Sequence, residues 1–267
     1  MPISPARAFF ESALRDKITF NTSHRMAPSE TALAERMLAR GLELEGLYEE
    51  VYSATEVDEQ RHIFLACCVL DIGLCWTEAD GRQARDDKKR LEELNADIAE
   101  LADELAGLLE QRTAVNERGA FSTDHAFHIL DVMDEAARGN GLYPLYLREP
   151  LDHLRGRFEL KYWPKLAEVV RAIGQDSTRA GVEPLDPLTA AMCQSTRSSK
   201  ADVVRAIQAS IEHNKRGGMH CLPDSFKLTD GALASLTNVL LDLHADKLVD
   251  AEYVKNIGNR PLKRRKD

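Results

Sequence analysis

The chain has 267 residues, of which 43% are hydrophobic and 30% charged, and its formal net charge is −9. This composition is that of a folded globular protein and excludes disorder over most of the chain. The acidic excess lies in residues 1–118, which carry 14 basic and 24 acidic side chains, and it disfavours nucleic acid as a partner of this part of the chain.

The sequence shows no segment that predicts export or membrane insertion. Its longest apolar run, Ile63–Leu70, is much shorter than the roughly 20 residues that a membrane span requires. Glu11 and Asp16 interrupt the N-terminal stretch that would have to be apolar in an export signal. Three of the five cysteines lie in or close to the apolar run, which favours reduced thiols packed in a core. We therefore expect a cytoplasmic protein without a membrane partner.

Helix start and stop signals recur along the chain, whereas alternating β-branched runs between turn residues are missing. The pattern predicts an all-α helical bundle. Ser29 is expected to cap an early helix that ends at Gly41, and a second helix follows over about 42–52. A helix over about 55–76 is apolar on nearly every side between Ile63 and Trp76, so we expect it at the centre of a core.

A long, charged helix is expected from about Gln83 to Glu117, after a chain break at Asp80-Gly81. With Leu91 as position a of a heptad, apolar residues fill nearly all a and d positions for more than three heptads, and only Arg112 interrupts them. Such a run is typical of a coiled coil. The apolar a and d residues are Leu91, Leu94, Ile98, Leu101, Leu105, Leu108 and Val115.

This apolar seam could be covered by another chain or by a neighbouring helix of the same chain. The helix is basic at its start and acidic over residues 92–110, so a homodimer of this helix gains nothing from flanking charges. The apolar helix just upstream is joined to it by a short loop. The sequence therefore predicts an antiparallel hairpin over about 55–117, with dimerisation or a basic partner helix as the alternatives.

The rest of the chain is expected to form shorter helices. Ser122 and Thr123 are predicted to cap a helix that ends near Gly139, and the Gly- and Pro-rich stretch 174–187 is the best linker. Further helices are expected to begin at Asp186-Pro187, at Ser199 with Asp202, and at Thr229-Asp230. The predicted domains are 1–180 with the long hairpin, a smaller helical region over 181–259, and a basic tail over 260–267.

Few motifs carry recognisable chemistry. A Walker loop, a Rossmann glycine fingerprint, a nucleophile elbow and a zincin helix are all missing, so we expect no cofactor. Asp124, His128, Asp131 and Glu135 stand at i, i+4, i+7 and i+11 and would share one helical face. Carboxylates beside an imidazole can bind a divalent metal or orient a general base. The alternative is a solvated surface, because the apolar stripe lies on the opposite face.

An arginine followed at short distance by a histidine occurs as "REPLDH", from Arg148 to His153, and as "RGAFSTDH", from Arg118 to His125. This spacing resembles that of the HEPN-type ribonucleases, an all-α family. The resemblance covers only these few residues. It implies RNA cleavage by Arg148 and His153 at a cleft shared with a second copy.

Two charged surfaces suggest binding partners. The acidic face of the long helix would suit a basic protein partner, through Glu92, Glu93, Glu100, Asp103 and Glu110. The C-terminal cations could contact nucleic-acid phosphates or an acidic protein, or could simply form a solvated terminus, and they are Arg260, Lys263, Arg264, Arg265 and Lys266.

The interpretation that these patterns favour is a non-enzymatic interaction or adaptor subunit of an intracellular protein assembly, with a possible nucleic-acid contact through the tail. A catalytic role is left open, as a HEPN-like or a metal-dependent nuclease. A helical DNA-binding module over residues 187–262 is a further alternative, carried by Lys200, Arg205, Lys215, Arg216 and the tail. The oligomeric state is not predicted.

Overall fold

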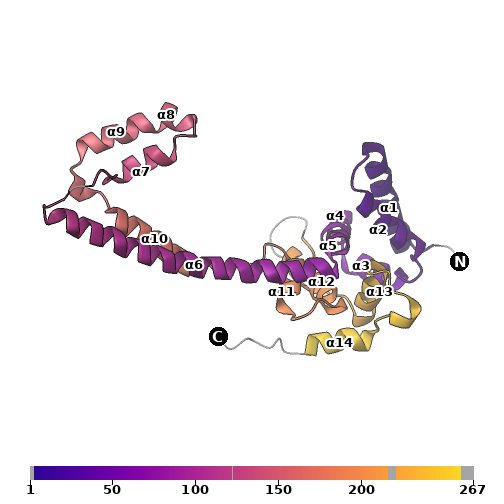
Figure 1. The fold of residues 1–267 in the computed structure, drawn as a ribbon. Coiled ribbons are helices and arrows are strands. Elements are labelled where there is room, and N and C mark those ends of the chain that lie inside the picture. Colours follow the sequence, from indigo (N-terminus) through magenta and orange to yellow (C-terminus); the bar gives the residue numbers. More distant parts are fainter. Residues whose placement is uncertain (1–2, 122, 216–220, 260–267) are drawn as a thin grey trace. The chain divides into compact units, whose positions relative to one another are not determined.

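The structure, a computed structural model, describes residues 3–121, 123–215 and 221–259. Over these residues the fold is all-α and contains no strand, which confirms the predicted fold class (Figure 1). The elements are α1 (Pro5–His24), α2 (Pro28–Ala39), α3 (Glu45–Ala54), α4 (Asp58–Ile63), the π-helix η1 (Phe64–Leu70), α5 (Asp71–Cys75), α6 (Glu78–Glu117), α7 (Ile129–Ala136), α8 (Leu142–Tyr146), α9 (Arg148–Arg157), the 3₁₀ helix η2 (Leu160–Tyr162), α10 (Leu166–Arg179), α11 (Pro187–Gln194), α12 (Lys200–Asn214), α13 (Asp230–Leu240), the 3₁₀ helix η3 (Ala245–Lys247) and α14 (Ala251–Asn259).

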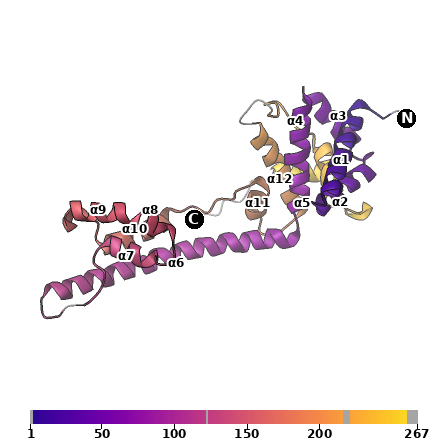
Figure 2. The same ribbon diagram turned by 90° about the horizontal axis from the view of Figure 1, so that it is seen from above.

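The chain packs into two compact units. Unit 1 combines residues 1–88 with residues 183–267, and unit 2 is the continuous stretch 89–182. Helix α6 begins in unit 1 and continues through unit 2 (Figures 1 and 2). This grouping differs from the division predicted from the sequence, 1–180 and 181–259, because the C-terminal helices pack with the N-terminal ones. The boundary near residue 182 lies within the predicted linker 174–187.

Side chains from the N-terminal helices bind the backbone of the C-terminal helices within unit 1. The guanidinium of Arg36 on α2 donates to the carbonyl oxygen of Leu240 at 2.9 Å, and Arg40 donates to the carbonyl oxygen of Asn238 at 3.0 Å. These carbonyls lie in the last turn of α13, where a helix lacks internal donors and a cation is favourable. The two arginines therefore join parts of the chain about 200 residues apart.

Unit 1 has a continuous apolar core. Helix α1 begins at Pro5, and the Ser4 hydroxyl accepts a hydrogen bond from the backbone N–H of Arg7 at 3.3 Å. Its inward face carries Phe10, whose ring stacks on Tyr48 of α3 at a centroid distance of 4.8 Å. The largest fully buried side chains of this core are Tyr48, Phe10, Phe64, Phe226, Leu14, Met37, Leu44, Leu47, Ile207, Leu222, Leu236 and Val51.

The segment α4–η1–α5 lies in this core, as its apolar sequence predicts, but it does not form the predicted antiparallel hairpin with the long helix. Trp76 is extended, and the helix axis turns by 88° between Asp58–Cys75 and Glu78–Glu117. The apolar surface of η1, which was expected to cover α6, packs inside unit 1 instead. There the Ser210 hydroxyl of α12 donates to the carbonyl oxygen of Cys67 at 3.0 Å. The hairpin prediction is therefore wrong.

The predicted chain break at Asp80-Gly81 is also wrong, because both residues lie inside α6. The helix starts at Glu78, and the hydroxyl of Thr77 accepts from the backbone N–H of Asp80 at 3.0 Å. A Cβ on Gly81 would lie 2.4 Å from the hydroxyl of Ser198. Gly81 thus permits close packing on the segment before α12 and does not form a turn.

Within the described residues, no single helix has the length and apolar content needed to cross a membrane, although α4–α5 and α6 would pass that test as a bent pair.

In unit 2, α6 forms an antiparallel pair with α10, a helix far downstream in the sequence (Figures 1 and 2). Asn95 donates to the carbonyl oxygen of Ala180 at 3.3 Å, and a Cβ on Gly174 would lie 2.9 Å from that of Ala102. Near the other end of the pair, Arg171 reaches Glu110 at 3.0 Å. The contacts run in opposite directions along the two helices, so an antiparallel partner exists, but it is α10 and not α5.

Candidate functional site

The leucine seam of α6, which we define as Leu91, Leu94, Ile98, Leu101, Leu105, Leu108 and Val115, is exposed along its whole length. The exposed fractions run from 36% at Leu94 to 62% at Leu101. Heptad spacing places these side chains along one line of the helix surface. The seam is therefore an apolar strip, interrupted only at Arg112, that stays exposed among the residues described in unit 2.

The seam stays uncovered because α10 packs on a different stripe of α6. That stripe consists of small residues next to the seam, and its buried members include Ala102 and Ala106, the latter with 0% exposure. On α10, Gly174 faces it, and a Cβ there would lie 3.2 Å from the backbone oxygen of Ala99. Small side chains let two helices approach closely, so the pairing is decided by alanine and glycine and leaves the leucines free.

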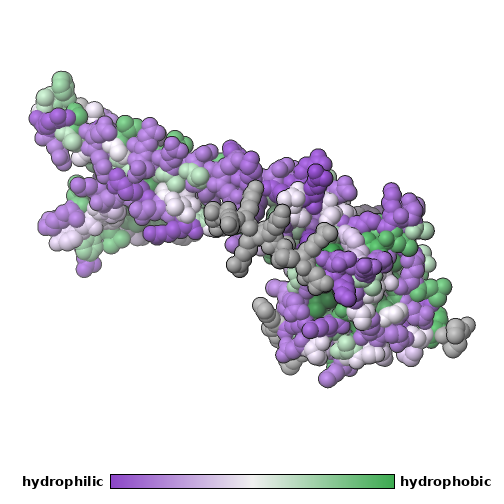
Figure 3. All heavy atoms as spheres, turned by 90° about the horizontal axis from the view of Figure 1, so that it is seen from below, coloured by the Kyte–Doolittle hydropathy of each residue, from purple (hydrophilic) through white to green (hydrophobic). Residues whose placement is uncertain are grey.

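Unit 2 has little apolar core of its own. Its buried apolar side chains are Ala102, Ala106, Leu130, Tyr143 and Ala167, whereas all of the core cluster given above lies in unit 1. Most of the large exposed apolar residues belong to unit 2. Figure 3 shows hydrophobic residues reaching the surface of this unit among hydrophilic ones. Scattered exposed apolar residues are normal, but contiguous apolar surfaces mark interaction sites.

The acidic residues predicted to bind a protein partner are partly neutralised within the chain. Glu93 lies 3.2 Å from the ammonium of Lys89. The guanidinium of Arg171 on α10 lies 3.6 Å from Asp103 and 3.0 Å from Glu110. The hydrogen bond from Arg171, with its charge, holds the pKa of the Glu110 carboxyl below its usual value.

The remaining two predicted acids, Glu92 and Glu100, are both exposed on α6.

The predicted metal-binding face is not formed, because α7 begins only at Ile129 and Asp124 lies outside it. His128 is the N-cap, and its Nδ1 accepts from the backbone N–H of Leu130 at 3.1 Å. Asp131 is bound by Arg155 at 2.6 Å. The fourth candidate, Glu135, pairs with Arg138 at 2.5 Å. Among the residues that the structure describes, no group of three or more His, Cys, Asp or Glu side chains could hold a metal ion.

Arg148 and His153, the predicted nuclease pair, both lie on α9, which buries none of its residues. At about 100° per residue they point roughly 140° apart around the helix axis. Arg148 faces Asp134 of α7 at 3.7 Å. The two side chains therefore do not converge on one site within a chain.

The cations of the predicted DNA-binding module are engaged in contacts within unit 1 wherever they are described. Lys200 donates to the carbonyl oxygen of Lys247, Arg205 pairs with Asp202 at 3.4 Å, and Lys215 pairs with Glu212 at 2.5 Å. Arg216 and the predicted phosphate-binding residues Arg260, Lys263, Arg264, Arg265 and Lys266 lie outside the described residues.

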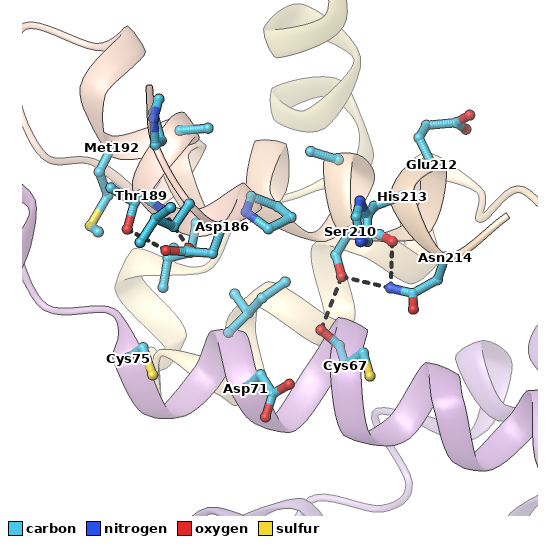
Figure 4. A pocket seen from close by; sticks show the side chains of 17 residues that line it. Cys67, Asp71, Cys75, Asp186, Thr189, Met192, Ser210, Glu212, His213 and Asn214 are labelled. Carbon is cyan, nitrogen blue, oxygen red and sulfur yellow. Dashed lines mark hydrogen bonds between the residues drawn. The ribbon is translucent and has the colours of Figure 1, made fainter. Parts of the chain in front are cut away.

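Unit 1 contains a cavity of about 850 Å³ between η1–α5 and the helices α11 and α12 (Figure 4). Asp186, at the entrance to α11, accepts from the backbone N–H of Thr189 at 2.8 Å. Asn214 donates to the Ser210 carbonyl oxygen at 2.8 Å, so that several polar groups in Figure 4 already have partners. The sequence gives no sign of this cavity, because its walls come from segments more than 100 residues apart.

The thiols in the cavity are not activated as nucleophiles. Burial, helped by the charge of Asp71, raises the pKa of the Cys67 thiol above its ordinary value, and burial followed by the charges of nearby aspartates does the same for the pKa of Cys75. Burial also raises the pKa of the Asp71 carboxyl, to which Glu30 adds. A reactive cysteine needs a lowered pKa, usually from a nearby cation. Among the described lining residues there is no lysine or arginine.

Comparison with protein-family models, with curated proteins and with solved structures finds no match to this chain.

Proposed function

We propose that the protein is a non-enzymatic interaction subunit of a protein assembly and that unit 2 makes the contacts. The observation that carries this proposal is the exposed leucine seam of α6, whereas the apolar core of unit 1 is buried within that unit. Since the candidate catalytic pair and metal ligands do not converge, no observation favours either nuclease alternative.

The energy available from the seam supports this role. Complete burial of one leucine, isoleucine or valine side chain stabilises a protein by about 1.5–3 kcal/mol. Because the seam residues are each about half exposed, covering all of them would contribute roughly 5–10 kcal/mol per chain. Association costs about 4–15 kcal/mol in lost translational and rotational freedom, so the seam could supply most of what a stable contact requires.

The acidic side chains around the seam would select the partner. Asp97 and Glu104 occupy position g, directly beside the a and d residues, and Glu100 at position c lies beyond position g, farther from the seam. All three are exposed. A partner surface with an apolar strip and flanking cations would match them, because opposite charges favour encounter and like charges disfavour wrong partners.

Affinity capture from the native host tests the proposal, with the full chain and the variant Leu101→Glu/Leu105→Glu as baits. The control is Ala114→Glu, which adds one negative charge, against two in the double variant, at an exposed position on another face of α6. We expect stoichiometric protein partners with the wild type and the control and their loss with the double variant. A set of captured proteins that is the same for all three baits would contradict the proposal.

A further inference from the structure

We propose that the leucine seam of α6 is covered by α9 of a second copy of this chain. In the resulting dimer α9 of each chain packs on the seam of the other chain, so that two equivalent α6–α9 contacts form. This inference deepens the proposed function and rests on it, because it names the first component of the assembly.

Helix α9 and its two capping residues carry apolar side chains with the same spacing as the seam: Leu151 and Leu154 lie in the helix, and Leu147 and the extended Phe158 are its caps. Leu147, Leu151, Leu154 and Phe158 follow one another at intervals of four, three and four residues. Leu94, Ile98, Leu101 and Leu105 of α6 have the same intervals. Leu147, Leu154 and Phe158 are exposed and Leu151 is half-buried. Two helices with matching heptad stripes can pack by inserting the side chains of one between those of the other.

The charges beside the two stripes are opposite. If Leu147 is given position d, Arg148 and Arg155 fall on position e and Arg157 on position g, so arginines flank the stripe of α9 on both sides. On α6 the flanking position g holds Asp97 and Glu104, whereas position e holds the uncharged Asn95, Ala102 and Leu109. Charges at e and g positions decide which helices pair and how they are oriented.

The arginines of α9 retain donors for such a contact. Arg155 binds Asp131 at 2.6 Å and Arg148 faces Asp134 at 3.7 Å, yet their side chains are 41% and 57% exposed. A guanidinium has five N–H donors and can serve two carboxylates. Arg157 has its guanidinium 5.6 Å from the ring centre of Phe158, at the end of the stripe.

The matching apolar spacing and the opposite charges favour α9 over a second α6 as the partner of the seam. Two α6 helices would bring Asp97 and Glu104 close to the acidic stretch 92–110 of the other copy, where like charges repel. The α10 side of α6 is already occupied. A reciprocal pairing of α6 with α9 uses two complementary surfaces that one chain carries, and it closes as a twofold dimer.

The test is a complementation experiment on the full chain. Variant A carries Ile98→Glu and Leu101→Glu on α6, and variant B carries Leu154→Glu on α9. We expect the wild type to form dimers, and we expect the dimer dissociation constant of each variant alone to be at least tenfold higher. A mixture of A and B with different tags should form mixed dimers, because one α6–α9 contact remains intact in that pair. The control Ala114→Glu should behave as the wild type.

A second pair of variants keeps the apolar stripes intact, for the case in which variant A or B fails to fold. Arg157→Glu should raise the dimer dissociation constant several-fold, and adding Glu104→Arg in the same chain should recover most of that loss. Wild-type chains that stay monomeric at all concentrations would overturn the inference. So would dimers that resist both Leu154→Glu and Arg157→Glu.

The two proposals can fail separately, because the dimer is measured on the purified chain and the assembly in host extract. A monomer whose seam captures another protein would refute the second copy and leave the interaction subunit intact. A dimer whose wild-type and double-variant baits capture the same other proteins would leave the second copy intact and refute a role in a larger assembly.

Discussion

Substituting Gly174 by alanine should loosen the α6–α10 pair, although alanine is the better helix former. Gly107 on α6 provides the matched control, since a Cβ there meets nothing within 4 Å. Each substitution gains about 1 kcal/mol of helix stability. At Gly174 the new Cβ would lie 2.9 Å from the Cβ of Ala102 and 3.2 Å from the backbone oxygen of Ala99, and neither atom can move without displacing α6.

Overpacking of this kind costs about 1–3 kcal/mol. The helix gain acts on α10 in Gly174→Ala and on α6 in Gly107→Ala, so in α10 it offsets about 1 kcal/mol of the steric cost. Hydrogen exchange of the α10 amides measures the net effect locally, which matters because a two-unit chain need not unfold in one step. Exchange should be up to about 30-fold faster in Gly174→Ala than in Gly107→Ala. Exchange about fivefold slower in Gly174→Ala, as the helix gain alone would give, would refute the close α6–α10 contact.

Two further predictions concern unit 1. The carboxylate of Glu11 is buried and lies 2.7 Å from the guanidinium of Arg7 and 2.6 Å from that of Arg15. Burial raises the pKa of this carboxyl, but the hydrogen bonds from the two arginines outweigh burial and hold the pKa below its ordinary value of 4.5. Glu11→Gln should therefore lower the free energy of unfolding by about 1.5–3 kcal/mol at neutral pH, and urea titrations should show this gap closing as the pH falls through the lowered pKa. Alkylation at pH 8 should modify exposed Cys75 well before Cys68, whose pKa burial raises to about 12.

For each of these two predictions one outcome would contradict the structure. If the gap between wild type and Glu11→Gln were constant from pH 7 to pH 3, the ion pairs would not account for the stability that Glu11 provides. The unfolded chain in urea is the control for alkylation, because there Cys68 and Cys75 should react alike. Modification of Cys68 in the native chain at the rate of Cys75 would contradict its burial.

Local capping chemistry made several helix starts predictable. Asp202 bonds the backbone N–H of Ser199 as expected, and the Thr229 hydroxyl accepts from the backbone N–H of Ala232. Ser29 was expected to cap α2, but that helix begins at Pro28 after Ala27 in the left-handed region, with φ of 47°. Thr123 was expected to cap the next helix, but His128 is the N-cap of α7, and Ser122, the other candidate, lies outside the described residues. Capping patterns are short, and a compatible residue nearby can take the role.

The partner of the long helix could not be predicted from its heptads. A heptad pattern shows which side chains lie on one line, but it does not show what covers them. The decisive residues were a second stripe, Ala99, Ala102 and Ala106, and the single Gly174 more than 60 residues downstream. Small residues at heptad intervals are a usable signal for close helix packing. The leucines beside them predicted a hairpin with the upstream helix instead.

The mass of the purified full chain in solution tests the central claim most directly, because the claim is that the leucine seam of α6 is an interface between two copies of this chain. Sedimentation equilibrium over a wide concentration range should give twice the 29.9 kDa of one chain, falling towards that value on dilution. The variant Ile98→Glu/Leu101→Glu should give 29.9 kDa at concentrations where the wild type is dimeric. A wild-type mass of 29.9 kDa at every concentration, with the seam still open to solvent, would contradict the account.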